Sequence, residues 1–226
     1  MSAKSVCEMS CGAMHEFALV LDKAGFDADL VHKIVNSKGN KHAKKMYTSL
    51  ASVSGEDERF ELVNTFEVTV PEGYNHATHL DTFRKAHEQE FYYYNPAITD
   101  KNYGNATTKL VPGRKFQVKV FQIKETVSSD DCLGFLKSQK AVLVGAQGAS
   151  LAYEQRKDKL PVDRWSVSFD EKKTLWKDAG GYHRVPDVYR YSDGVFKFHL
   201  GSFVADWLDA HCLLCFCDLE PESSGA

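Results

Sequence analysis

The chain has 226 residues, of which 43% are hydrophobic and 26% are charged, and its formal net charge is -3. This composition excludes a fibrous repeat and a fully disordered chain, because enough apolar surface is present to form a core. The small negative charge also excludes a general electrostatic attraction to nucleic acid or to anionic lipid. Any such contact would need a local basic patch.

No segment approaches the roughly 20 apolar residues that cross a bilayer, and the N-terminal stretch lacks the uninterrupted apolar core of a secretory signal. We therefore expect a cytoplasmic protein with no membrane partner. In that compartment the six cysteines are expected to be free thiols rather than a disulfide framework.

The first 54 residues predict a small helical module. Apolar residues recur at helical spacing over residues 13–24, where Gly25 ends the stripe. A second amphipathic stretch is terminated by Gly39, and a third helix starts at Asn40. Three short helices of this kind are expected to pack on the domain that follows, because so small a module buries little surface alone.

Four lysines gather around the start of the third predicted helix, namely Lys38, Lys41, Lys44 and Lys45. Following two helices joined by a glycine turn, they permit a helix-turn-helix interpretation in which the lysines meet phosphates. Arginine, the residue that reads guanine edges, is absent from the first 58 residues. A nucleic-acid-binding regulator is therefore one alternative, and a solvated helix face is the other.

Residues 55–226 predict an α+β domain. The expected elements are a strand near 59–72 with a slip at Asn64, a helix over 79–91, a long loop over 92–114, a strand over 115–127, a capped helix over 128–139 and a helical segment over 149–159. From Arg164 onward, short strands and turns predict an antiparallel, aromatic-rich sheet with a hairpin at Asp193-Gly194. The polar tail from about residue 220 is expected to be disordered.

The C-terminal segment HCLLCFCD offers two interpretations. His211, Cys212, Cys215 and Cys217 are residue types that bind zinc, and Cys212 and Cys215 have CxxC spacing. In a strand, however, Cys215 and Cys217 share one face and Cys212 points to the other. A buried core strand with reduced cysteines is the competing interpretation.

Catalytic motifs are weak in this chain. His76, His79 and His87 could belong to a metal-dependent enzyme, but they form no HExxH pair, and a solvated helix face is the preferred interpretation. The glycine-rich GAQGAS segment matches neither a phosphate-binding loop nor a nucleophile elbow. The sequence therefore names no catalytic residue and no cofactor.

The segment VADWLDAHCLLCFCD resembles the closing strands of C-type-lectin-like domains, with Trp207, Asp209, Cys212 and Cys217 at the matching positions. Leu208 stands where that family has a calcium-ligating asparagine, and no Glu-Pro-Asn tripeptide occurs. The resemblance therefore implies the fold without calcium-dependent sugar binding.

The wider stretch 116–218 resembles hypothetical proteins of bacteria, and bacterial members of the lectin-like class display variable residues to binding partners. By analogy, a binding surface would be lined by aromatic and basic residues, which are Tyr182, His183, Arg184, Tyr189, Arg190, Tyr191 and Trp207. Tyrosine and arginine dominate binding hot spots. The leading hypothesis is a non-enzymatic recognition protein that contacts another macromolecule, an unknown protein partner, through its C-terminal sheet.

Overall fold

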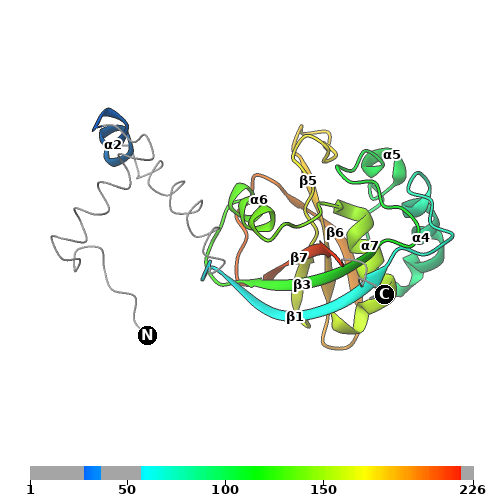
Figure 1. The fold of residues 1–226 in the computed structure, drawn as a ribbon. Helices are drawn as coiled ribbons and strands as arrows, with labels where there is room; N and C mark the ends of the chain where they lie inside the picture. The colour runs from blue at the N-terminus through cyan, green and yellow to red at the C-terminus, as the bar shows by residue number, and fades with distance from the viewer. Residues whose placement is uncertain (1–27, 37–56, 220–226) are drawn as a thin grey trace, which may run out of the picture. The chain divides into compact units, whose positions relative to one another are not determined.

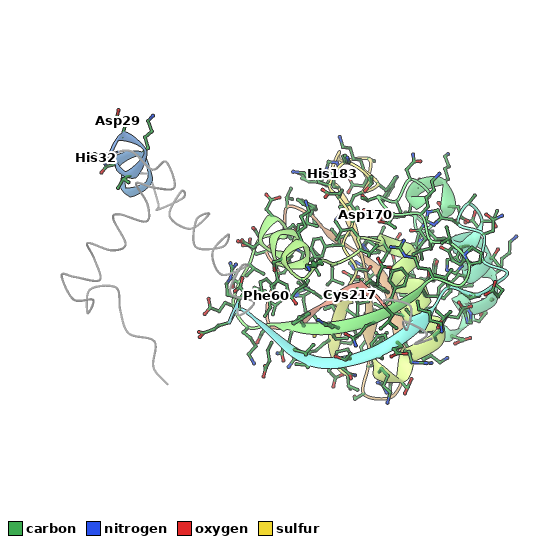
Figure 2. All side chains as sticks on the ribbon, viewed as in Figure 1. Asp29, His32, Phe60, Asp170, His183 and Cys217 are labelled. Atoms are coloured by element: carbon green, nitrogen blue, oxygen red, sulfur yellow. The ribbon has the colours of Figure 1, made fainter. Side chains whose placement is uncertain are left out.

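The computed structural model describes residues 28–36 and 57–219. The chain divides into two units, Met1–Leu50 and Ala51–Ala226, and each is described by itself. In the first unit the described element is helix α2 (Ala28–Val35), on which Asp29 and His32 are exposed (Figure 2). The rest of the predicted three-helix module and the tail from residue 220 lie outside the described residues.

The second unit is built on one sheet of seven strands in the order β1-β3-β7-β4-β5-β6-β2 (Figure 1). The strands are β1 (Phe60–Thr69), β2 (Phe91–Tyr94), β3 (Lys115–Ile123), β4 (Arg164–Val167), β5 (Arg184–Arg190), β6 (Phe196–Ser202) and β7 (His211–Asp218). Neighbours are antiparallel except for the parallel pairs β4–β7 and β2–β6. The α+β class is as predicted, but the C-terminal sheet is mixed rather than purely antiparallel.

Strand β7 is the reason for that difference. It does not continue the β4–β5–β6 meander at an edge, but returns to the centre of the sheet, antiparallel to β3 and parallel to β4. Its residues 212–216 are buried, as a central strand covered on both faces requires. The apolar run CLLCF suits this position, although the run alone does not tell which strands lie beside it.

The helices of this unit are α4 (His79–His87), α5 (Asp100–Tyr103), α6 (Ser129–Ser138) and α7 (Gly145–Arg156), with 3-10 segments at Glu88–Glu90 and Lys157–Lys159. In Figure 1, α4, α5 and α7 lie at one side of the unit and α6 at the other. The region predicted as a long loop contains α5 and most of edge strand β2. This strand was missed because its partner β6 lies about a hundred residues further along the chain.

A β-bulge in β1 sends its side chains into two different layers. The pairing with β3 shifts between Leu62 and Asn64, which confirms the predicted slip and places Phe60 and Phe66 on opposite faces. Phe60 stacks on Phe135 of α6, with ring centroids 4.1 Å apart. Phe66 is buried on the opposite face of the sheet, where α7 packs.

Helix α6 begins where the sequence predicts. The Ser128 hydroxyl accepts a hydrogen bond from the Asp131 backbone N–H, and the Asp131 side chain accepts one from the Ser128 backbone, which completes a capping box. These bonds satisfy backbone donors that the first turn of a helix leaves unpaired. The cap therefore fixes the start of the helix that covers Phe60.

Helix α7 begins at Gly145, four residues before the predicted helical segment. Residues 145–153 are all buried, so this part of the helix has no polar face to produce a periodic signal in the sequence. At Gly148 a Cβ would lie 3.0 Å from the Phe216 ring of β7 and 2.3 Å from Val144 Cγ2. Glycine is needed here because the helix approaches the sheet closely.

The contact between α4 and α7 contains a polar pair in which Ser150 is buried and His79 is half-buried. His79 Nε2 lies 2.8 Å from Ser150 Oγ, and the imidazole ring centroid is 4.6 Å from that of Tyr74. Burial, with smaller effects of His76 and His87, lowers the pKa of His79 from 6.5 to about 4. The imidazole is therefore neutral in the folded protein under ordinary conditions.

We expect this histidine to make stability depend on pH. The folded state holds His79 neutral, whereas the unfolded chain protonates it near pH 6.5. The contribution of His79 to the free energy of unfolding is therefore present above pH 6.5 and is lost as the pH falls toward 4. The loss amounts to about 1 to 3 kcal/mol. His79→Gln should flatten the decline of the unfolding free energy between these pH values in urea titrations. Equal slopes for variant and wild type would contradict this account.

Candidate binding face

One face of the sheet carries partly exposed aromatic side chains, and we call it the aromatic face. Directly paired residues of antiparallel strands point to the same side. Trp165 of β4 pairs with Tyr189 of β5, which pairs with Lys197 of β6. The aromatic face consists of Tyr93, Trp165, Tyr189, Tyr191, Lys197 and His199, all of them exposed or half-exposed.

The rings of the aromatic face contact one another in a row. The Trp165 ring centroid lies 4.8 Å from that of Tyr189 and 5.3 Å from that of His199. On one side Tyr93 of β2 is 6.3 Å from His199, and on the other Tyr191 is 4.6 Å from Tyr189. Such contacts between rings fix their orientations, so the row is a preformed surface on rigid strands.

A buried carboxyl group lies beneath this row. Asp187 is 3% exposed, and its Oδ1 is 3.2 Å from Nδ1 of His199, whose side chain is 42% exposed. Burial raises the pKa of Asp187, and the neighbouring His199 opposes that effect. The pair holds the imidazole in one orientation at the centre of the aromatic face.

Gly201 and Trp207 enclose the buried carboxyl from the other end of β6. A Cβ at Gly201 would lie 2.8 Å from Trp207 Cη2 and 3.1 Å from Asp187 Oδ2. The Trp207 indole is 2% exposed, and its Nε1 donates a 2.8 Å hydrogen bond to Ser129 Oγ at the start of α6. The aromatic face is therefore anchored to α6 through a tryptophan that is itself buried.

The residues that the sequence assigned to binding do not form a single surface. Tyr189 and Tyr191 lie on the aromatic face, but Arg190 between them points to the opposite side. Its Nη1 donates to the carbonyl oxygens of Asp158 and Leu160, at 2.8 and 2.9 Å. The structure gives this arginine a role inside the fold.

The other predicted binding residues lie elsewhere. Tyr182 and His183 belong to the turn before β5, and Arg184 is the first residue of that strand. The Arg184 guanidinium donates to the Asp178 carboxylate. Tyr182 is 51% exposed, and His183 is half-buried. Trp207, being buried, offers no surface to a partner. The lysine cluster Lys38, Lys41, Lys44 and Lys45 lies outside the described residues.

Four residues of the aromatic face were missed from the sequence, namely Tyr93, Trp165, Lys197 and His199. Lys197 and His199 alternate with buried phenylalanines along β6, and that alternation indicates an outward-facing side. The other two lie in short strands of four residues, where periodicity is too brief to read. Only the pairing of strands brings the four together.

Strand β7 divides its cysteines as the alternation predicted. The sulfur atoms of Cys215 and Cys217 lie 3.7 Å apart, whereas Cys212, an odd number of residues away, points to the other face. Within residues 28–36 and 57–219, no group of three or more histidine, cysteine, aspartate or glutamate side chains comes together as a metal site. The proposed ligands His211, Cys212, Cys215 and Cys217 are therefore not gathered at one point.

The three histidines considered for a metal site each have their own partner. His79 contacts Ser150, as described, and His76 Nδ1 accepts a 3.2 Å hydrogen bond from the Leu110 backbone. His87 Nδ1 lies 2.8 Å from a carboxylate oxygen of Glu90. His79 and His87 connect α4 to its surroundings, His76 holds the segment before that helix, and the three side chains do not converge on one position.

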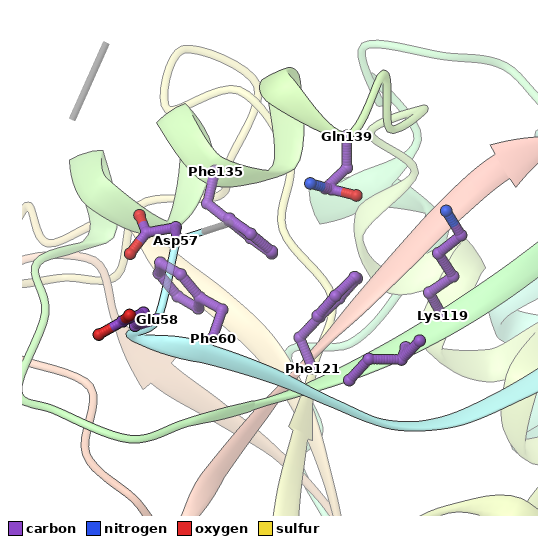
Figure 3. A pocket seen from close by; sticks show the side chains of 8 residues that line it. Asp57, Glu58, Phe60, Lys119, Phe121, Phe135 and Gln139 are labelled. Atoms are coloured by element: carbon purple, nitrogen blue, oxygen red, sulfur yellow. The ribbon is translucent and has the colours of Figure 1, made fainter. Parts of the chain in front are cut away.

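A second feature on the same side of the sheet is a hollow of about 450 Å³ between β1, β3 and α6 (Figure 3). Figure 3 shows the rings of Phe60, Phe121 and Phe135 along it, with Lys119 and Gln139 toward one end. The walls combine apolar rings with a few polar groups, a mixture typical of ligand sites. The hollow is open to solvent and lies next to the cysteine pair of β7.

Comparison of the chain with protein-family models, with curated proteins and with solved structures finds no match. The lectin-like resemblance thus rests on its four residues near the C-terminus alone. Among the helices of the described segments, none combines the length and apolarity needed to traverse a bilayer.

We expect Gly201→Ala to destabilise the protein. The added methyl group would collide with the buried Trp207 ring and approach Asp187, and overpacking of this kind costs about 1 to 3 kcal/mol. Gly73→Ala is the matched control, because no atom lies within 4 Å of a Cβ placed there. Urea unfolding of both variants measures the difference, and equal stability of the two would contradict the packing described here.

Metal analysis tests the placement of the cysteines. Because Cys212 points away from Cys215 and Cys217, Cys212→Ala should leave the zinc content of protein purified without chelator unchanged. Elemental analysis of wild type and variant provides the measurement. Zinc that is present in the wild type and disappears in this variant would show that β7 binds metal in another conformation.

Proposed function

We propose that this chain is a recognition protein that binds a segment of a partner protein on its aromatic face. The observation that carries the proposal is the row in which Tyr93 and Trp165 contact His199 and Tyr189 contacts Trp165. Tyrosine and tryptophan are enriched at the centres of protein interfaces because they supply large contact areas at low conformational cost. In this row they stand on strands, so little order is lost on binding.

The position of the row within the sheet supports the same conclusion. The opposite side of β5 is covered by α7, which supplies the hydrophobic core. Aromatic rings on the open side add nothing to that core and expose apolar area to water, a condition that marks interaction sites. The neighbouring Tyr92 is 76% exposed and extends the surface beyond edge strand β2.

The charge of the face favours a protein over a nucleic acid. Lys197 is the one lysine or arginine of the aromatic face, and its Nζ lies 5.2 Å from the Tyr191 ring centroid and 5.4 Å from that of Tyr92. Single-stranded nucleic acids need a positively charged groove along the backbone as well as stacking rings. One lysine already engaged with two rings does not supply such a groove.

A site-specific crosslink identifies the partner. A photo-reactive phenylalanine analogue at Tyr191, on the aromatic face, should capture a defined protein in cells, whereas the same analogue at Tyr182, in the turn before β5, should not. The captured protein is then purified and its affinity for the full chain is measured.

Substitution of one ring tests the surface quantitatively. Tyr189→Ala should raise the dissociation constant for the purified partner by about tenfold or more, because central aromatic residues carry most of the binding energy. Tyr182→Ala, an exposed tyrosine outside the face, should change it little. Equal effects of the two substitutions would reject the aromatic face as the binding site.

The same titrations distinguish the nucleic-acid alternative. If a single-stranded oligonucleotide competes for the aromatic face and its affinity falls steeply with salt, phosphate contacts dominate. That outcome would replace the protein partner by a nucleic acid. Binding that is independent of Tyr189 would instead direct attention to the lysine cluster of residues 38–45.

A further inference from the structure

We propose that Cys215 and Cys217 form a redox-active dithiol in which Cys217 attacks a disulfide and Cys215 completes the exchange. Their sulfur atoms are 3.7 Å apart on the same face of β7, and they can join once the end of this strand deforms and brings the two Cβ atoms closer together. Cys215 is fully buried and Cys217 is partly exposed. This difference suits an attacking thiol that meets the substrate and a second thiol protected behind it.

The surroundings of Cys217 favour its thiolate. The hydrogen bond from the Cys215 thiol, and to a lesser extent the positive charge of Lys119, lowers the pKa of Cys217 against the opposing effects of burial and of Asp218. Lys119 lies directly across from Cys215 in the β3–β7 pairing. Hydrogen bonding to Cys217 and burial raise the pKa of Cys215, so this thiol keeps its proton until the first step is complete.

The remaining described cysteines are unlike this pair. Burial raises the pKa of Cys212 to about 11 and also raises that of Cys132 in α6. Both are fully buried, and a buried, protonated thiol is a poor nucleophile. Within the described residues, the thiol of Cys217 therefore combines partial exposure with a stabilised thiolate.

Access to the pair comes from the side of the hollow described above. Cys217 Sγ lies 3.6 Å from the carbonyl oxygen of Gln139, to which it donates only in its protonated form. Gln139 lines the hollow together with Lys119 (Figure 3). Figure 2 shows Cys217 at the sheet, well away from His183. The dithiol is thus separate from the turn that carries His183.

The exchange balances with a disulfide RS–SR as the oxidant. The Cys217 thiolate attacks one sulfur of RS–SR, which forms a mixed disulfide and releases RS⁻. The Cys215 thiol then loses its proton and attacks Cys217 Sγ, which forms the Cys215–Cys217 disulfide and releases the second sulfur as RSH. Two electrons pass from the protein to the substrate, and two thiol groups of the substrate are produced.

Strand geometry makes the product a labile disulfide. Two residues along a strand span about 6.6 Å between Cα atoms, near the upper end of the range that a disulfide accepts. Their Cβ atoms point the same way and lie about as far apart, beyond the roughly 4.5 Å that an unstrained disulfide accepts, so the backbone must deform locally. A bond formed there is strained and is reduced easily. The pair is therefore suited to rapid, reversible exchange rather than to a permanent crosslink.

The test uses the full chain and glutathione disulfide. After exposure and rapid acid quenching, trypsin leaves residues 198–226 as one peptide, because it contains no lysine or arginine. We expect this peptide to lose the mass of two hydrogen atoms, with the link between Cys215 and Cys217 and with Cys212 free. Dithiothreitol should restore the original mass.

Three variants assign the two roles. Cys215→Ala should accumulate the mixed disulfide on Cys217, Cys217→Ala should stay unmodified in this peptide, and Cys212→Ala should behave as the wild type. Alkylation by iodoacetamide should be about tenfold or more faster at Cys217 than at Cys212. A wild-type peptide that stays reduced, or that stops at a mixed disulfide, would overturn the proposal without reliance on any variant.

Discussion

The burial of β7 at the centre of the sheet is the constraint on which the rest of the second unit depends. Within the sheet this strand joins the β1–β3 pair to the β4–β5–β6–β2 group through an antiparallel and a parallel ladder. A central strand must be apolar on both faces because neither meets water. The segment CLLCF meets that demand with cysteine as a small hydrophobe, and an unpaired polar side chain there would cost stability.

The two faces of this sheet have different cover and consequently different chemistry. Helix α7 packs so closely on one face that Gly148 has no room for a Cβ, which makes that face a dry core. On the other face α6 covers the part near Phe60 and Phe135, and the aromatic face stays open. The open side therefore holds the groups that can meet other molecules. Asp187, a buried carboxyl paired with His199, lies on the same side.

Recognition and redox chemistry are assigned to different parts of this open side. The aromatic face extends over β4, β5, β6 and β2, while the dithiol belongs to β7 and faces Lys119 of β3. Binding to aromatic rings depends on the contact area that they offer, whereas thiol exchange requires a stabilised thiolate. The two proposals therefore rest on independent observations, and neither needs the other to be correct.

The sequence by itself determined the local features of the second unit. The bulge near Asn64, the Ser128 cap and the Asp193-Gly194 hairpin follow from short-range rules of pleat, capping and turn geometry, and the structure contains all three. The opposite orientation of Cys212 and Cys215 follows from the strand period of two. Tertiary structure alone decided that β7 lies between β3 and β4, that Tyr93 and Trp165 both meet His199, and that Trp207 is buried. These facts depend on pairing between strands far apart in the chain, and no local pattern encodes which strands become neighbours.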